Sequence, residues 1–187
     1  MNTKFLTAAA VLAFSLSTGA QASLTSSGPL TVYDSGQNLT WTKDANLNGQ
    51  MNWATAKAWA ENLDYAGYTD WVLPTITQLA NQFSTNLGEP AGKSITAIDG
   101  HNANYALFDN VQSYVYWSGS EYAPNPNYAW YFGTYNGSQG YGSKGNQLYA
   151  WAVRPGDVAA VPVPGAFWLF GTAMVGLMGL KRRKNIA

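Results

Sequence analysis

The 187-residue chain carries ten basic and ten acidic side chains, distributed unevenly, together with one histidine and no cysteine. All ten acidic residues lie between positions 34 and 157, where there are only five basic residues, so this region has a net charge of −5. A negative charge argues against binding to nucleic acids and other phosphate polymers. The lack of cysteine excludes a disulfide framework and, with a single histidine, a structural zinc site.

The N-terminus is typical of a secretory signal peptide over residues 1–22. One lysine precedes an apolar run over residues 6–16, and Ala20-Gln21-Ala22 forms a small-x-small cleavage site. We expect signal peptidase to cleave after Ala22. The alternative is a buried N-terminal helix. Residues 23–30 are polar and are expected to form a linker.

Two strands and a helix are predicted next. The sequences LTVYD (30–34) and LTWT (39–42) are separated by a short polar turn, which is the pattern of a hairpin. Apolar residues then recur at helical spacing over 53–63, with Asn52 as the N-cap and Gly67 as a stop signal.

A second helix follows a short apolar segment. WVLP at 71–74 predicts a buried strand ended by proline. TITQ at 75–78 has the S/T-x-x-Q pattern of a capping box, and the helix it begins presents an apolar face of Ile76, Leu79 and Phe83.

The remainder of the central region consists of a loop and three aromatic strands. Residues 87–110 have no clear period and are expected to form a long loop with local structure. Strands are predicted at 114–118, 128–135 and 148–154, with a tight turn at Asn136-Gly137. This order predicts an α+β fold with an antiparallel sheet.

The C-terminal sequence predicts a short transmembrane helix. Residues 158–165 form a proline-containing linker, and the uncharged run over 165–180 would be about 24 Å long as a helix, a little short of the roughly 30 Å hydrocarbon core. We expect the helix and its basic end within 166–187, with the end held in the cytoplasm. The basic residues are Lys181, Arg182, Arg183 and Lys184.

This C-terminal pattern resembles the PEP-CTERM sorting signal over residues 161–184. The resemblance implies handling by an exosortase-type enzyme and processing near Pro162, Val163 and Pro164. Val163 stands where the named motif has an acidic residue. The alternative is a permanent single-span anchor. With either tail we expect an exported protein in the cell envelope, at the cell surface or in the extracellular matrix.

The sequences DANLNG, DWVLPT, YWSGSEY and WAVR, in this order, resemble the Lcl C-terminal domain family over about residues 39–154. The resemblance implies a C-type-lectin-like domain over 31–157, with two helices packed on a small twisted antiparallel sheet and long loops. One namesake is a bacterial surface adhesin that binds sulfated glycans, so adhesion is the implied function. Val72 stands where relatives often have Arg, and Gln78 where they often have Glu.

Asp44, Asn46 and Asn48 copy the start of a calcium-binding EF-hand loop. Its twelfth position is Thr55, not the bidentate Glu, so the EF-hand motif is incomplete. Two alternatives stay open. One is a weak calcium site completed from elsewhere, and the other is a turn in which these side chains bond the local backbone.

The aromatic strands and their loops favour carbohydrate binding, because sugars offer apolar C–H faces to aromatic rings and hydroxyls to polar groups. By strand alternation Trp130 and Phe132 share one face, whereas Tyr131 and Tyr135 share the other, and one set is expected to fill the core. Core packing is the alternative for each single aromatic residue. The candidate ligand-binding residues are Trp117, Glu121, Tyr122, Tyr128, Tyr131, Tyr135, Asn136 and Tyr141. The tryptophans assigned to the core are Trp41, Trp53, Trp59, Trp71 and Trp151.

Catalysis finds little support in the sequence. His101 is the only histidine, no G-x-S-x-G motif is present, and nothing sets the separation of a Glu121–Asp109 pair. We therefore expect a non-enzymatic module that binds extracellular polysaccharide without a cofactor. The alternative is a structural envelope or biofilm-matrix protein with no defined ligand.

Overall fold

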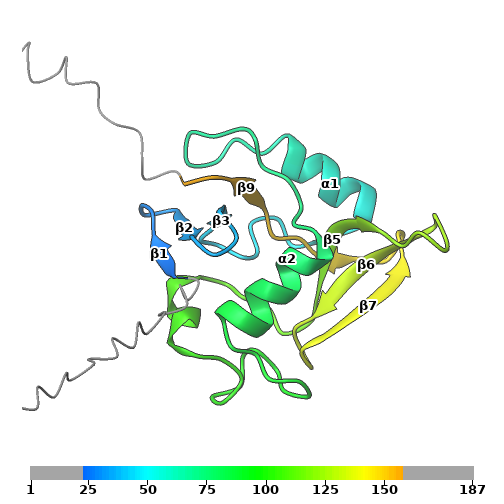
Figure 1. The fold of residues 1–187 in the computed structure, drawn as a ribbon. Coiled ribbons are helices and arrows are strands. Elements are labelled where there is room, and N and C mark those ends of the chain that lie inside the picture. Colours follow the sequence, from blue (N-terminus) through cyan, green and yellow to red (C-terminus); the bar gives the residue numbers. More distant parts are fainter. Residues whose placement is uncertain (1–22, 158–187) are drawn as a thin grey trace, which may run out of the picture.

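The computed structural model describes residues 23–157, which form two β-sheets and two α-helices (Figure 1). The strands are β1 (Leu24–Ser26), β2 (Thr31–Asp34), β3 (Leu39–Thr42), β4 (Gln50–Met51), β5 (Val115–Glu121), β6 (Tyr128–Gly133), β7 (Ser138–Ser143), β8 (Leu148–Tyr149) and β9 (Val153–Pro155). The two α-helices are α1 (Trp53–Glu61) and α2 (Ile76–Ala80). The α2 helix continues directly as the π-helix η1 (Asn81–Asn86), and a 3-10 helix, η2 (Ala103–Leu107), follows later in the chain. The predicted α+β class is confirmed.

The first sheet has the order β1-β2-β3-β9 and contains both ends of the described chain. The predicted β2–β3 hairpin is confirmed, with Val32 paired to Trp41, and β9 closes the sheet against β3. Residues 23–30, expected to form a linker, contain β1, which pairs with β2. The polar sequence of β1 gave no strand signal, because its pairing depends on the strand that follows.

The second sheet has the order β4-β8-β5-β6-β7, and helices cover parts of both its faces. Side chains alternate along β5 and β6, so Tyr116 and Phe132 pack in the same cluster as Leu79 and Phe83 of α2 and η1. Trp117 packs on the opposite face, in the cluster that includes the buried residues of α1. Figure 1 shows α2 to the left of β6 and β7, and α1 above them.

Three expectations about strands are corrected. The segment 148–154 is divided between β8 and β9 in different sheets, because buried Trp151 lies between them. WVLP forms no regular strand, and Val72 makes only an isolated bridge to Val153. The second sheet is mixed, since β5 and β8 pair in parallel.

The predicted helix starts are confirmed by their caps. The Asn52 side chain accepts a hydrogen bond from the Thr55 N–H, and Thr75 and Gln78 form the reciprocal capping box. The first helix ends at Glu61 with Asn62 as its C-cap, earlier than Gly67, which lies in the following turn with φ +81°. The long loop at 87–110 is also confirmed, with η2 as its local structure.

The interior is rich in tryptophan. The ring centroids of Trp41 and Trp151 lie 4.9 Å apart, and both side chains are completely buried. Trp71 is only 1% exposed. Trp53 is 6% exposed, so these four core assignments are confirmed, and Trp59 packs partly buried against the same cluster as Trp53.

No helix within residues 23–157 is long and apolar enough to cross a membrane. The expected signal peptide (1–22), the proline-containing sorting motif (158–165) and the transmembrane helix (166–187) lie outside the described residues.

Candidate functional site

Four aromatic side chains gather at one end of the second sheet, and we call them the tip cluster: Tyr122, Tyr128, Trp130 and Tyr141. The rings of Tyr122 and Tyr141 stack with centroids 3.9 Å apart and an interplanar angle of 8°. Trp130 meets both in edge-to-face contacts, at 5.3 Å from Tyr122 and 5.8 Å from Tyr141. Tyr128 lies edge-on to Tyr141 at 6.2 Å.

Strand register explains this gathering. Trp130 of β6 pairs with Tyr141 of β7, so the two rings share one face, and Tyr128 lies two residues along β6 on that face. A bulge between Trp117 and Glu121 shifts the register of β5 against β6. The turn after β5 is closed by a hydrogen bond from the Tyr122 N–H to the Tyr128 carbonyl, at 3.1 Å.

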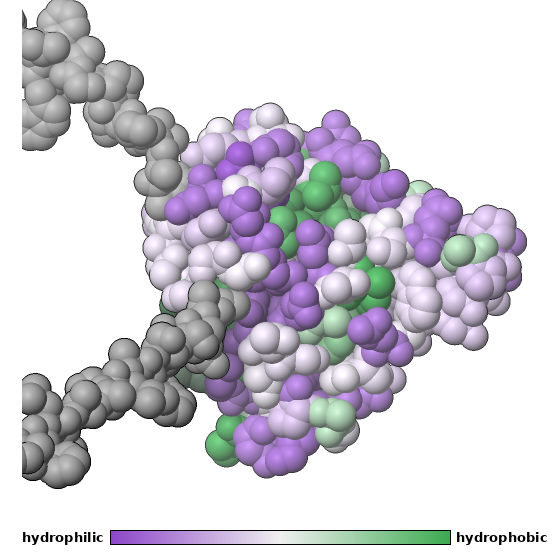
Figure 2. Space-filling model, in the orientation of Figure 1, coloured by the Kyte–Doolittle hydropathy of each residue, from purple (hydrophilic) through white to green (hydrophobic). Residues whose placement is uncertain are grey.

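The tip cluster belongs to the outer surface. Tyr141 is 50% exposed, and the other three side chains are half-buried. Figure 1 shows the β5–β6 connection projecting at the right, away from α2. In Figure 2 the end of the molecule that projects at the right shows pale, purple and light green residues side by side. The pKa of Tyr122 is raised, chiefly by a hydrogen bond with the Tyr141 side chain.

Two of the predicted ligand residues lie on the α1 face of the sheet, away from the tip cluster. Trp117 is completely buried and its indole N–H donates to the Met51 carbonyl at 3.0 Å, so its prediction as a ligand contact is wrong. Tyr131 is half-buried beside Trp117. A Cβ at Gly140 would lie 2.6 Å from the Tyr131 ring, so glycine is what makes room for it.

The three other predicted residues are dispersed. Glu121 forms an ion pair with Lys144 at 3.2 Å, and the Lys144 ammonium lies 4.3 Å from the Trp53 ring centroid. Tyr135 and Asn136 belong to the β6–β7 turn at the opposite end of these strands, where Asn136 Oδ1 accepts a hydrogen bond from Ser138. The structure therefore brings Tyr122, Tyr128 and Tyr141 together and separates the rest.

Sequence reasoning missed Trp130. Strand alternation places Trp130 on the same face as Phe132, but the two residues differ in environment, since Phe132 is 1% exposed under η1 and Trp130 is half-buried beyond it. No strand is predicted from the sequence at β7, and the pairing of β7 with β6 is what places Tyr141 beside Trp130. The Gly-rich sequence SQGYGS has low intrinsic strand propensity.

The Asp44 loop forms the local hydrogen bonds of an Asx turn. Asp44 Oδ1 accepts from the Asn46 N–H at 2.8 Å, and Asn46 Oδ1 accepts from the Gly49 N–H at 3.1 Å. The other Asp44 oxygen accepts from Asn110, and Asn48 is exposed. Within residues 23–157 no three His, Cys, Asp or Glu side chains group as they would around a metal ion. The calcium site stays a prediction.

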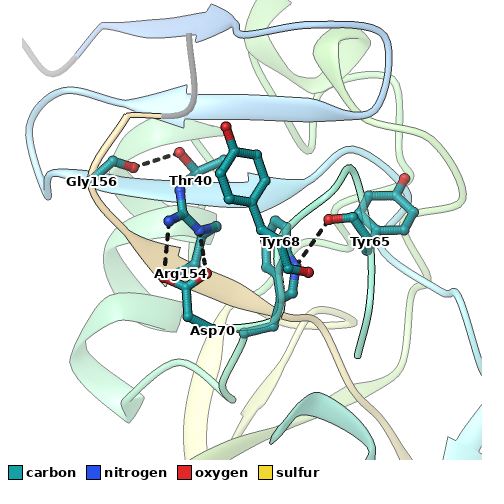
Figure 3. Close-up of polar contacts among 7 residues, drawn as sticks. Thr40, Tyr65, Tyr68, Asp70, Arg154 and Gly156 are labelled. Carbon is teal, nitrogen blue, oxygen red and sulfur yellow. Dashed lines mark hydrogen bonds and ion pairs between the residues drawn. The ribbon is translucent and has the colours of Figure 1, made fainter. Parts of the chain in front are cut away.

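A second polar constellation lies against β9 (Figure 3). The Arg154 guanidinium donates two hydrogen bonds to the Asp70 carboxylate, at 2.6 and 2.9 Å, and lies 4.1 Å from the Tyr68 ring centroid. Thr40 donates to the Gly156 carbonyl, and an indole N–H from Trp71 reaches the carbonyl of Tyr65. The hydrogen bond from Arg154 lowers the pKa of Asp70. The Arg154 contacts join β9 to the segment before α2.

Beside this constellation lies a groove of about 350 Å³ between residues 27–31 of the β1–β2 connection and the turn that holds Ala66 and Tyr68. Its rim includes Leu30, which is 44% exposed. The Arg154–Asp70 pair holds the Tyr68 side of the groove in place.

Comparison with known proteins gives one result for the family. No curated protein is similar enough to this chain to count as a match. The model of the Lcl C-terminal domain matches residues 30–154, well over half of the 187-residue chain. The chain therefore belongs to the Lcl C-terminal domain family.

Proposed function

We propose that this protein is a non-enzymatic bacterial surface or matrix protein whose Lcl C-terminal domain binds extracellular polysaccharide at the tip cluster. The observation that carries the proposal is the gathering of four aromatic rings, three of them half-buried and one 50% exposed, at the projecting end of a sheet.

The chemistry of the tip cluster suits a sugar. Rings such as Trp130 and Tyr141 offer flat apolar area to the C–H faces of a pyranose, while nearby polar groups can bond its hydroxyls. Gln139 is exposed on the same face of β7 as Tyr141, and Asn127 is exposed in the β5–β6 connection. Such a surface combines apolar contact with hydrogen bonding.

The proposed location depends on the two ends of the sequence. A signal peptide cleaved by signal peptidase after Ala22, a PEP-CTERM-type motif read by an exosortase-type enzyme at Pro162–Pro164, and a membrane helix with a basic cytoplasmic end together direct the domain to the envelope, cell surface or matrix.

We also propose that the domain is C-type-lectin-like. Two helices, small sheets, a long loop over 87–110 and chain ends that enter the same sheet support this assignment.

The proposed role involves neither catalysis nor a cofactor, and it draws on the contacts of His101 and of the Asp44 loop. His101 Nδ1 lies 2.6 Å from the Ile95 carbonyl, and its ring stacks on Tyr105 at 3.9 Å, which suits a structural role. The oxygens of Asp44 and Asn46 are engaged with backbone N–H groups.

The alternative is a structural matrix protein without a defined ligand. It is favoured by the stacking of Tyr122 on Tyr141, because each ring already covers one face of the other.

A glycan array separates the two functions. Full-length protein in mild detergent is applied to arrayed polysaccharides, with Trp130→Ala as the test variant and Tyr135→Ala as the control at the opposite turn. Binding that Trp130→Ala abolishes and Tyr135→Ala preserves is the expected result. An array without any bound polysaccharide, including those from bacterial matrices, would favour the structural alternative.

A further inference from the structure

The tip cluster is built from a part of the chain that carries no charge. Between Glu121 and Lys144 the sequence contains no Asp, Glu, Lys or Arg, and this stretch includes all four aromatic residues of the cluster. The segment that contains α2 and η1, between Asp70 and Glu89, is also free of charged residues. The segment that carries the tip cluster, with β6 and β7, and the segment that packs on the same face of the sheet, with α2 and η1, are therefore both uncharged.

The basic side chains of residues 23–157 have partners that are not residues of the tip cluster. Within residues 23–157 there are five, and four of them form ion pairs: Lys43 with Asp109 at 3.0 Å, Lys93 with Asp99, Lys144 with Glu121 at 3.2 Å and Arg154 with Asp70 at 2.6 Å. The fifth, Lys57, lies over the Trp53 ring on α1.

Lys144 directly follows β7 and is therefore the basic residue nearest in sequence to Tyr141. Its ammonium lies 4.3 Å from the Trp53 ring centroid, on the α1 face of the sheet. Tyr141 and Trp130 occupy the other face. The nearest cation in sequence is thus directed away from the tip cluster and is already paired with a carboxylate.

This distribution disfavours an anionic ligand. Sulfate and carboxylate groups on a polysaccharide are usually held by Arg or Lys, and binding them against uncharged rings would remove their hydration without replacing it. The net charge of −5 between positions 34 and 157 adds long-range repulsion of polyanions. A neutral sugar meets neither penalty.

Resting on the proposed function, we infer that the tip cluster binds a neutral polysaccharide through ring stacking and hydroxyl hydrogen bonds, and does not bind sulfated or uronic acid polymers. This differs from the sulfated glycans that the family resemblance implies. Trp130 and Tyr141 supply the stacking surface, and the tyrosine hydroxyls with the Gln139 amide supply hydrogen-bonding groups.

The test measures binding of full-length protein to two panels of probes. The neutral panel is dextran, galactomannan and cellohexaose, and the anionic panel is heparin, alginate and polygalacturonate. Each is titrated by calorimetry at about 0.05 and 0.5 M salt, because only charge-driven binding weakens steeply over this range. Tyr141→Ala is the test variant, and Tyr135→Ala is its matched control, since both tyrosines are 50% exposed.

We expect at least one neutral probe to bind with little salt dependence, and Tyr141→Ala to weaken it about tenfold or more. Binding to anionic probes alone, lost at high salt, would overturn this inference and leave the proposed function standing. Neutral binding that Tyr141→Ala does not change would overturn the assignment to the tip cluster. Binding to no probe here and to nothing on the array would overturn the proposed function itself.

Discussion

The tryptophan-rich interior and the tip cluster use the same kind of side chain in opposite ways. In the interior, the indole N–H groups of Trp53, Trp117 and Trp151 each donate to a backbone carbonyl at 2.8 to 3.0 Å, and the rings are at most 6% exposed. At the tip, rings contact one another and keep part of their surface in solvent. Aromatic content alone therefore does not identify a binding surface.

The largest effect is expected in the interior. Trp151 is completely buried, donates to the Thr42 carbonyl and contacts the rings of Trp41, Phe83 and Phe108. Trp151→Ala should reduce the free energy of unfolding by about 4 kcal/mol in urea denaturation, because it leaves a cavity and an unpaired carbonyl. Trp151→Phe should cost clearly less. Near-equal stability of Trp151→Ala and wild type would contradict the assigned core.

The next largest effect involves a buried carboxyl group within the loop at 87–110. Glu89 is 4% exposed, neither of its oxygens has a hydrogen-bond partner among the described residues, and burial raises its pKa to about 8. The nearby N–H groups of Gly137 and Ile95 oppose this rise only in part.

Because the folded state retains a proton that the unfolded chain releases near pH 4.5, stability should fall as pH rises from about 4.5 to about 8 and then level off. The contribution is on the order of 2 kcal/mol after allowance for solvent screening. Glu89→Gln should lack this slope and be the more stable protein at pH 9. Parallel pH–stability curves for the two proteins would disprove the assignment.

A smaller effect is expected at the Arg154–Asp70 pair, which is less buried than the tryptophan-rich interior. Arg154→Met should reduce stability by about 1.5 kcal/mol, because it removes a bidentate pair and the contact with Tyr68. The pair lowers the pKa of Asp70, so its contribution is present above the ordinary aspartate pKa and is lost as pH falls through the folded value.

Thermal unfolding of Asp70→Asn and Arg154→Met at pH 7 and pH 3 tests this pair. We expect both variants to be less stable than wild type at pH 7, with the difference narrowing in acid. A difference that is unchanged by acid would assign the effect to packing of the Arg154 stem instead of the ion pair.

The smallest effect on stability is expected at the tip. Tyr141→Ala and Tyr135→Ala remove side chains of equal exposure, so each should change the free energy of unfolding by less than about 1 kcal/mol. Calorimetric unfolding of the two variants checks this. A loss near that of Trp151→Ala for Tyr141→Ala would show that the tip cluster is a second core.

The local elements were predictable from the sequence because their signals are local. The Asn52 cap, the Thr75–Gln78 capping box and the β2–β3 hairpin depend on neighbouring residues. The strand at 148–154 failed because its division follows from the partners of β8 and β9, which come from different sheets.

The candidate site was predictable only in part for the same reason. Tyr122, Tyr128 and Tyr141 follow from composition, whereas their contact with Trp130 requires the register of β7. Trp117 was mistaken for a ligand contact because alternation identifies two faces without saying that α1 covers one of them.

The most direct test follows the indole ¹H–¹⁵N signals of the full-length protein during titration with the polysaccharide that binds best. We predict that the Trp130 signal shifts with ligand concentration, while the signals of Trp41 and Trp151 stay fixed because these rings are completely buried. Saturable binding that leaves the Trp130 signal unchanged would contradict the central claim that the exposed aromatic cluster, and not another surface, is the binding site.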